Sequence, residues 1–202
     1  MDHAHDLTLY LAAGAILAAP FGAWASERSR RWMVLAREPV VAVAVAIRHS
    51  VILLSLGAGA IHFAVTNDHY AEGLLAGLLM SAVAWFQLLW PVSVAGNPRR
   101  RFDLSAIAVN AGTILAWLAS RTVGLRPPIG DGRVELVGAL DVLATSFELG
   151  IVLGLTALLV GNGRLATRAV TTRSATLAVG VLALLVLVLT TAAIGGQPAH
   201  HH

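Results

Sequence analysis

The sequence of 202 residues contains no cysteine and no lysine, and only 12% of its residues are charged. Without cysteine the chain has no disulfide, no thiolate ligand for a metal and no thiol chemistry. A soluble domain carries about 25% charged residues. This small charged fraction, with 57% hydrophobic residues, indicates that a lipid bilayer is the solvent for most of the chain.

Several functional signatures are also absent. The sequence contains no HExxH, no GxSxG and no P-loop, so it does not point to the enzyme classes that these motifs mark. All 14 basic residues are arginines, and they stand in short segments between apolar runs. This placement is typical of membrane topology signals, so we expect no nucleic-acid partner. Facing helices that each offer a histidine are lacking, and we expect no haem.

Six apolar runs are long enough to cross a ~30 Å hydrocarbon core, which requires roughly 20 residues. They occupy most of the chain and leave no room for a separate soluble domain. The sequence therefore predicts an all-α membrane protein with six transmembrane helices in a single domain, 1–202. The predicted spans are residues 7–25, 43–66, 71–94, 104–120, 134–160 and 174–194. The stretch PVVAVAVAI at 39–47 is ambiguous and could instead lead into the second span.

The arginines predict the orientation of these spans. They concentrate in the first, third and fifth connecting segments, SERSRRWMVLAREP, GNPRRRF and GNGRLATRAVTTR. Segments rich in arginine remain in the cytoplasm. The prediction is a multi-pass protein of the cytoplasmic membrane with both termini on the extracytoplasmic side, since the N-terminal MDHAHD is acidic.

Polar residues within the spans recur at helical spacing, in steps of three, four or seven, and so share one face of each helix. The second span carries Arg48, Ser55 and His62, with His69 past its expected end; the fourth carries Asn110, Thr113, Trp117 and Arg121; the fifth carries Gly138, Asp141, Thr145 and Glu148. The first and last spans contain no ionisable residue in their cores, and we interpret them as scaffold.

The two acids of the fifth span determine which way this face points. If that span begins near Val134, Asp141 lies about 10 Å and Glu148 about 20 Å below the outer surface. His62 would lie about 6 Å below it, in the second span. A charge at the centre of a lipid-facing helix costs about 2.5–3.5 kcal/mol, so these acids should face inward, toward partners or a proton. We therefore expect a polar cavity that opens outward and is lined by spans two to five.

The segment TNDHYAE, 66–72, is expected to form the outer turn between spans two and three. Asp68 suits an N-cap there, and Glu72 falls near the first turn of span three, where the helix dipole favours an anion. Both residues therefore have a structural interpretation beside a functional one, and Glu72 is also placed to bond His62 or Arg121.

Other polar residues allow more than one role. His62 could ligate a metal, relay protons or simply bond a buried carbonyl group. Arg121 and Asp141 are expected to pair, either as architecture or as a switchable anion site. Glu148, being deeper, should be protonated or paired.

Small residues recur at the GxxxG spacing, in GLLAG (73–77) and GIVLG (150–154). This spacing lets helices approach closely. It fits either packing within one chain or a homo-oligomer.

Two segments, HFAVTNDHYAEGLLAG (62–77) and NAGTILAWLASRTVGLRPPIGDGRVELVGALDVLATSFE (110–148), carry a resemblance. The chain resembles a group of mainly actinobacterial multispanning membrane proteins with HF…H…E and SRTVGL…LD…AT…E segments. The resemblance covers roughly half the chain and implies no reaction. The recurring positions that it implies are His62, His69, Glu72, Arg121, Asp141, Thr145 and Glu148.

The leading hypothesis is a binding or transport protein for a divalent metal ion or protons. A metal would be held by His62, His69, Glu72, Asp141 and Glu148, with Arg121 as counter-ion. Nitrogen and oxygen ligands without sulfur suit zinc, manganese or iron. One alternative is a membrane-embedded enzyme acting on a lipid or quinone-like substrate. The other is a non-catalytic accessory subunit of a membrane complex, with the polar residues as internal glue.

Overall fold

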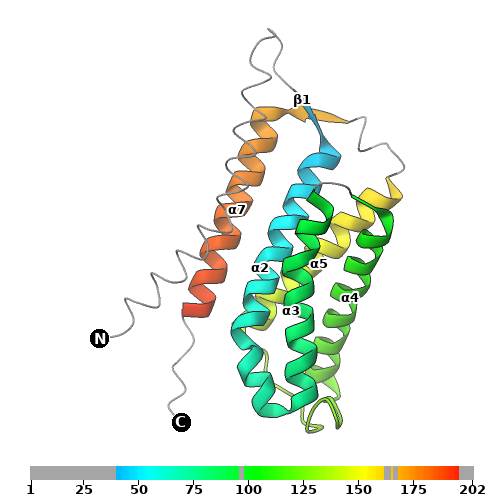
Figure 1. Ribbon diagram of the computed structural model, residues 1–202. Helices are drawn as coiled ribbons and strands as arrows, with labels where there is room; N and C mark the ends of the chain where they lie inside the picture. Colours follow the sequence, from blue (N-terminus) through cyan, green and yellow to red (C-terminus); the bar gives the residue numbers. More distant parts are fainter. Residues whose placement is uncertain (1–39, 96–97, 162–164, 166–167, 196–202) are drawn as a thin grey trace.

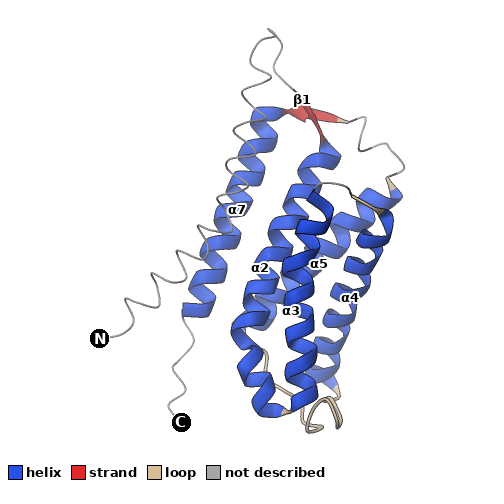
Figure 2. Cartoon of the chain, in the orientation of Figure 1, coloured by secondary structure: helices blue, strands red, loops and turns tan. Residues whose placement is uncertain are grey.

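A computed structural model describes residues 40–95, 98–161, 165 and 168–195. In this part of the chain five helices and two short strands form one bundle (Figures 1 and 2). In chain order the elements are β1 (Val40–Ala42), α2 (Val43–Glu72), α3 (Leu74–Ala95), α4 (Arg100–Thr122), α5 (Ala139–Val160), β2 (Ala169–Thr171) and α7 (Thr172–Gly195).

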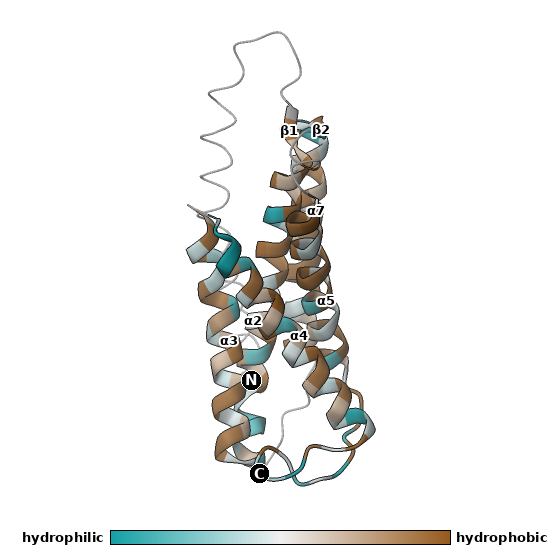
Figure 3. Ribbon diagram, turned by 90° about the vertical axis from the view of Figure 1, so that its right-hand side faces the viewer, coloured by the Kyte–Doolittle hydropathy of each residue, from teal (hydrophilic) through white to brown (hydrophobic). Residues whose placement is uncertain are grey.

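All five helices are long and apolar enough to cross a membrane. Large apolar side chains cover the outside of the bundle, and Leu153 and Leu184 are each 60% exposed. The ribbon of α7 is mostly brown in Figure 3, which marks its residues as hydrophobic. The all-α class is thus confirmed, and five of the six predicted spans correspond to helices. The expected first span, 7–25, lies outside the described residues.

The ends of two helices differ from the sequence prediction. Helix α2 continues to Glu72, because no glycine or proline occurs between residue 66 and Gly73, whose N–H donates to His69 O at 3.1 Å. The segment 66–72 is therefore the last part of a 30-residue helix rather than a turn. Asp68 is not an N-cap, and Glu72 ends α2 instead of opening the third span.

Helix α5 begins at Ala139, five residues later than predicted. Asp141 explains this start, because its Oδ2 accepts the N–H of Gly138 at 2.9 Å and so caps the first turn. Asp141 therefore lies about 3 Å from the helix start rather than 10 Å inside the membrane. Asp141 lies at one end of the bundle and not in its interior.

The two strands join the beginning of α2 to the beginning of α7. They pair antiparallel, with Val40 opposite Thr171 and Ala42 opposite Ala169. The N–H of Val43 continues the ladder by donating to Arg168 O at 2.9 Å. The ambiguous stretch at 39–47 thus supplies a strand and then the first turn of α2. We call this the ribbon end of the bundle, and the opposite end, with the segment 123–138 between α4 and α5, the loop end.

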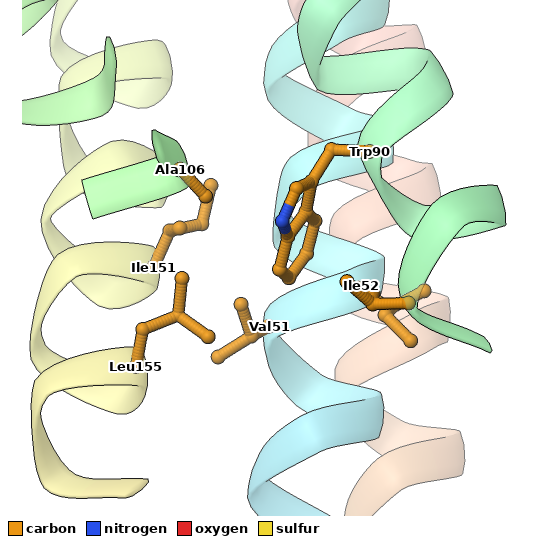
Figure 4. Packing of buried hydrophobic residues seen from close by; sticks show 7 residues of the cluster. Val51, Ile52, Trp90, Ala106, Ile151 and Leu155 are labelled. Carbon is orange, nitrogen blue, oxygen red and sulfur yellow. The ribbon is translucent and has the colours of Figure 1, made fainter. Parts of the chain in front are cut away.

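Helix α2 is the centre of the bundle, in contact with α3, α5 and α7, while α4 packs mainly against α5. One apolar core lies between α2, α3, α4 and α5. Figure 4 shows Val51, Trp90 and Leu155 of this core pointing toward one another from three different helices. A second core, which includes Phe147 and Val186, joins α5 and α7 to α2. Direct contact between α5 and α7 is slight.

The glycines of GIVLG let α5 approach α2. A Cβ atom on Gly154 would lie 2.5 Å from Val51 Cγ2, and one on Gly150 would lie 2.8 Å from Leu54 Cδ1. Both distances are too short for any side chain to fit without movement of its neighbour. These two glycines therefore serve packing within the chain.

This close approach predicts that Gly154→Leu destabilises the protein. Overpacking of a filled interface costs about 1–3 kcal/mol, so the variant should unfold at lower denaturant concentration than the wild type. Gly180→Leu is the control, because a Cβ atom at Gly180 in α7 meets nothing within 4 Å. Equal stability of the two variants in a detergent-micelle unfolding titration would contradict the packing role.

Candidate functional site

Four helices contribute polar side chains to one connected cluster inside the bundle. His62 comes from α2, Gln87 from α3, Asn110 from α4 and Glu148 from α5, and all four are buried. We call these four residues the central network. The network thus brings together polar groups that would individually be costly in hydrocarbon.

The contact between His62 and Glu148 is the only one in the network that joins two ionisable groups. His62 Nε2 lies 2.9 Å from Glu148 Oε1, and their side chains are 7% and 1% exposed. At this distance the two groups can share one proton, carried by either the imidazole or the carboxyl. Loss of that proton would leave a buried negative charge, and gain of a second would leave a buried positive one. A single proton between the two groups leaves the pair without net charge.

The two amide side chains of the central network, Gln87 and Asn110, are oriented by their hydrogen bonds. Asn110 Nδ2 donates to Ala106 O at 2.8 Å, which leaves Asn110 Oδ1 to accept from Gln87 Nε2 at 3.0 Å. Gln87 Nε2 also donates to Glu148 Oε1 at 3.2 Å. Glu148 Oε1 is thus held by a ring nitrogen and an amide at once. Gln87 Oε1, which points the other way, is buried without a hydrogen-bond partner among the described residues.

His62 and Glu148 lie at the same depth. His62 is ten residues before the end of α2, about 15 Å, and Glu148 is nine residues after the start of α5, about 14 Å. Both ends belong to the loop end of the bundle. Counted from the loop end, this distance is about half the thickness of a ~30 Å hydrocarbon core. The prediction of about 6 Å for His62 is therefore wrong, because it assumed that the helix ended at residue 66.

A buried ion pair lies nearer the ribbon end. Arg48 of α2 donates to both carboxylate oxygens of Asp103 of α4, at 2.5 and 2.8 Å. The side chains are 19% and 5% exposed. This two-bond geometry is the strongest that a guanidinium and a carboxylate can form, and it links two helices that have little other contact.

A second cluster of charges occupies the loop end. Arg121, at the end of α4, donates to Asp141 Oδ2 at 2.6 Å and also to Glu135. Glu135 is brought there by its own N–H, which donates to Ser120 O at 3.1 Å. The expected pairing of Arg121 with Asp141 is confirmed. Arg121 is the counter-ion of these two acids, and the deeper Glu148 pairs with His62 instead.

The five residues considered as metal ligands are held in three separate places. His62 pairs with Glu148, and Asp141 pairs with Arg121. His69 lies 3.7 Å from Glu72 in the last turn of α2, seven residues and so about 10 Å from His62. Metal ligands must each lie about 2 Å from the ion. Within the described ranges, no group of three or more histidine, aspartate or glutamate side chains is arranged to hold a metal.

Two important residues were not anticipated from the sequence. Gln87 is the one amide in an otherwise apolar stretch, AVAWFQLLWPV, and an isolated amide inside a span was the available signal. Asp103 follows RRRF and reads as part of a charged loop. The structure places it in the first turn of α4, on the same face as Asn110 seven residues later.

The resemblance to actinobacterial multispanning proteins stays a prediction. Comparison with models of protein families, with curated proteins and with solved structures found no match.

The pair of Arg48 and Asp103 predicts a stability test. Removal of one partner leaves an uncompensated buried charge, so Arg48→Ala or Asp103→Ala should each cost about 3–5 kcal/mol of unfolding free energy. The apolar double variant Arg48→Met with Asp103→Leu should lose less than either single variant. A double-mutant cycle measured in micelles checks this, and additive losses would contradict a direct pair.

Proposed function

We propose that the chain is a multi-pass protein of the cytoplasmic membrane that binds and transfers protons at the central network, with His62 and Glu148 as the proton-carrying groups. The observation that supports this most is the 2.9 Å contact between His62 Nε2 and Glu148 Oε1 at mid-membrane depth. A histidine and a carboxyl in contact inside a membrane are typical of proton relays.

The choice of protons over a divalent metal follows from the number of ligands. A metal site needs three or four side-chain donors, whereas the central network offers one imidazole and one carboxyl group. Its other members are amides, of which Gln87 and Asn110 already bond to each other. One shared proton needs only the two groups of the pair, whereas a metal ion would lack enough ligands.

Other polar groups continue the proposed route in both directions. The pair of Arg48 and Asp103 lies toward the ribbon end, and the cluster around Arg121 lies at the loop end. Along α4, Asp103 and Arg121 are 18 residues apart, which is about 27 Å. Polar groups on this one helix thus extend over nearly the whole thickness of a ~30 Å hydrocarbon core.

A membrane-embedded enzyme would need a passage from the polar residues to the lipid. Among the described residues, an apolar groove is lined mainly by α2, α5 and α7, and none of the four network residues belongs to its lining. This separation favours an ion function over catalysis on a lipid or quinone-like substrate.

The proposed orientation has the ribbon end in the cytoplasm. Five arginines surround that end, namely Arg99, Arg100, Arg101, Arg168 and Arg173. At the loop end, five acids accompany three arginines: Asp68, Glu72, Asp131, Glu135 and Asp141 with Arg121, Arg126 and Arg133. Cytoplasmic ends carry the arginine excess.

The orientation predicts which ends an impermeant thiol reagent reaches. The chain has no cysteine, so in each single-cysteine variant the introduced thiol is the only one that can react. Asp131→Cys should react in intact cells, and Arg100→Cys should react only after lysis. The reverse pattern would place the ribbon end outside and would contradict the proposed orientation.

Proton binding predicts a titrating carboxyl group inside the bundle. Infrared difference spectra of the reconstituted protein, recorded between about pH 4 and 9, should show a carboxylic-acid band that disappears in Glu148→Gln. The band should persist in Asp141→Asn, the matched control, because Asp141 lies at the bundle end beside Arg121. Proton flux into liposomes should fall on the order of a hundredfold in Glu148→Gln, the size of effect that positioned proton-transfer groups have in enzymes.

Two results would overturn the proposal. Equal flux in wild type and Glu148→Gln, with no titrating band in the wild type, would favour the accessory subunit with a static polar core. A stoichiometric metal ion in the purified protein, lost from both His62→Ala and Glu148→Ala while the fold persists, would favour the metal function.

A further inference from the structure

An apolar groove opens near the ribbon end, where α7 diverges from α5 (Figure 1). Its volume is about 410 Å³, and it is lined by Val43, Ile47 and Leu54 of α2, by Gly154 of α5 and by Ala178 of α7, among others. This volume falls within the ~300–1,000 Å³ of small-molecule sites. The groove faces the region that hydrocarbon would occupy in a membrane.

Two arginines are close in the chain to residues that line the ribbon-end part of this groove. Arg168 is exposed two residues before Val170, and Arg173 is exposed directly before Ser174; Val170 and Ser174 both line the groove. Neither arginine forms an ion pair with another of the residues that the structure describes. Positive charge therefore lies where the apolar groove meets the membrane surface.

We propose that this groove binds one anionic phospholipid, with an acyl chain between α2, α5 and α7 and its phosphate group beside Arg168 and Arg173. The chemistry is complementary at both ends. The groove wall is almost wholly apolar, as an acyl chain requires, and a guanidinium is a strong donor to phosphate oxygens. Basic pockets between transmembrane helices bind anionic headgroups in this way.

The size of the groove favours a lipid chain over a helix. A helix with its side chains is about 10–12 Å wide, and a space of 410 Å³ accommodates only a short part of one. The two arginines also have no role in docking an apolar helix, whereas they supply the charge that selects an anionic over a neutral lipid.

The test is lipid selectivity of the full chain in nanodiscs. The probe is phosphatidylglycerol with a spin label on its acyl chain, and the signal is the motionally restricted fraction, compared with labelled phosphatidylcholine. The wild type should prefer phosphatidylglycerol. The double variant Arg168→Gln with Arg173→Gln should lose about fivefold of this preference for each arginine removed. The control is Arg99→Gln with Arg100→Gln, which removes equal charge from the ribbon end at α4. This control should retain the preference for phosphatidylglycerol.

The groove itself is tested by filling it. Ala178→Trp should abolish the restricted phosphatidylglycerol component, and Leu177→Trp should not, because Leu177 is 60% exposed and does not line the groove. Thermal unfolding of each variant confirms that it is folded. Equal binding of the two lipids, equal loss in the α4 control, or retention in Ala178→Trp would overturn the proposal.

Cross-linking identifies a different occupant. A disulfide between two copies of Ala178→Cys would assign the groove to a second copy of the chain. A disulfide between Ala178→Cys and Ala15→Cys in one chain would assign it to the predicted first span. Either result would overturn the lipid site.

Discussion

The bond between His62 and Glu148 is the interaction on which the rest of the bundle depends. Apolar side chains offer no hydrogen-bond partner, so a carboxyl group buried inside a bundle of apolar helices must find one on another helix. Glu148 meets His62 of α2 and Gln87 of α3, and it thereby fixes how three helices are rotated about their axes. Apolar packing alone would fix those rotations less strictly, because many apolar faces are interchangeable.

The seven-residue stripe on α2 extends this principle along the whole helix. Arg48 bonds α4, Ser55 bonds the backbone of α3 and His62 bonds α5. Each step of the stripe is about 10 Å, so the polar contacts form successive levels separated by apolar layers. Helix α2 holds the bundle together because one of its faces supplies a polar partner to each of three neighbours.

The sequence was sufficient for the class of fold and for the inward face of the polar residues. Apolar runs identified the helices, and the cost of burying charge turned Arg48, His62 and Glu148 inward as predicted. The partners were harder to predict, because Gln87 is an isolated amide and Asp103 reads as part of a charged loop. The predicted end of α2 and the predicted start of α5 were wrong, because they depend on local details, namely the late Gly73 and the capping by Asp141. The depth of each polar residue is counted from these helix ends, so the wrong ends also gave the wrong depths for His62 and Asp141.

The pairing of β1 with β2 also bears on the order in which the molecule is assembled. The ribosome makes β1 before the four helices of the polar core, and it makes β2 only after all four are complete. Helices α2 to α5 can thus settle their polar contacts before β1 finds its partner. Helix α7 then packs at the edge of the bundle, where β2, directly before it, pairs with β1.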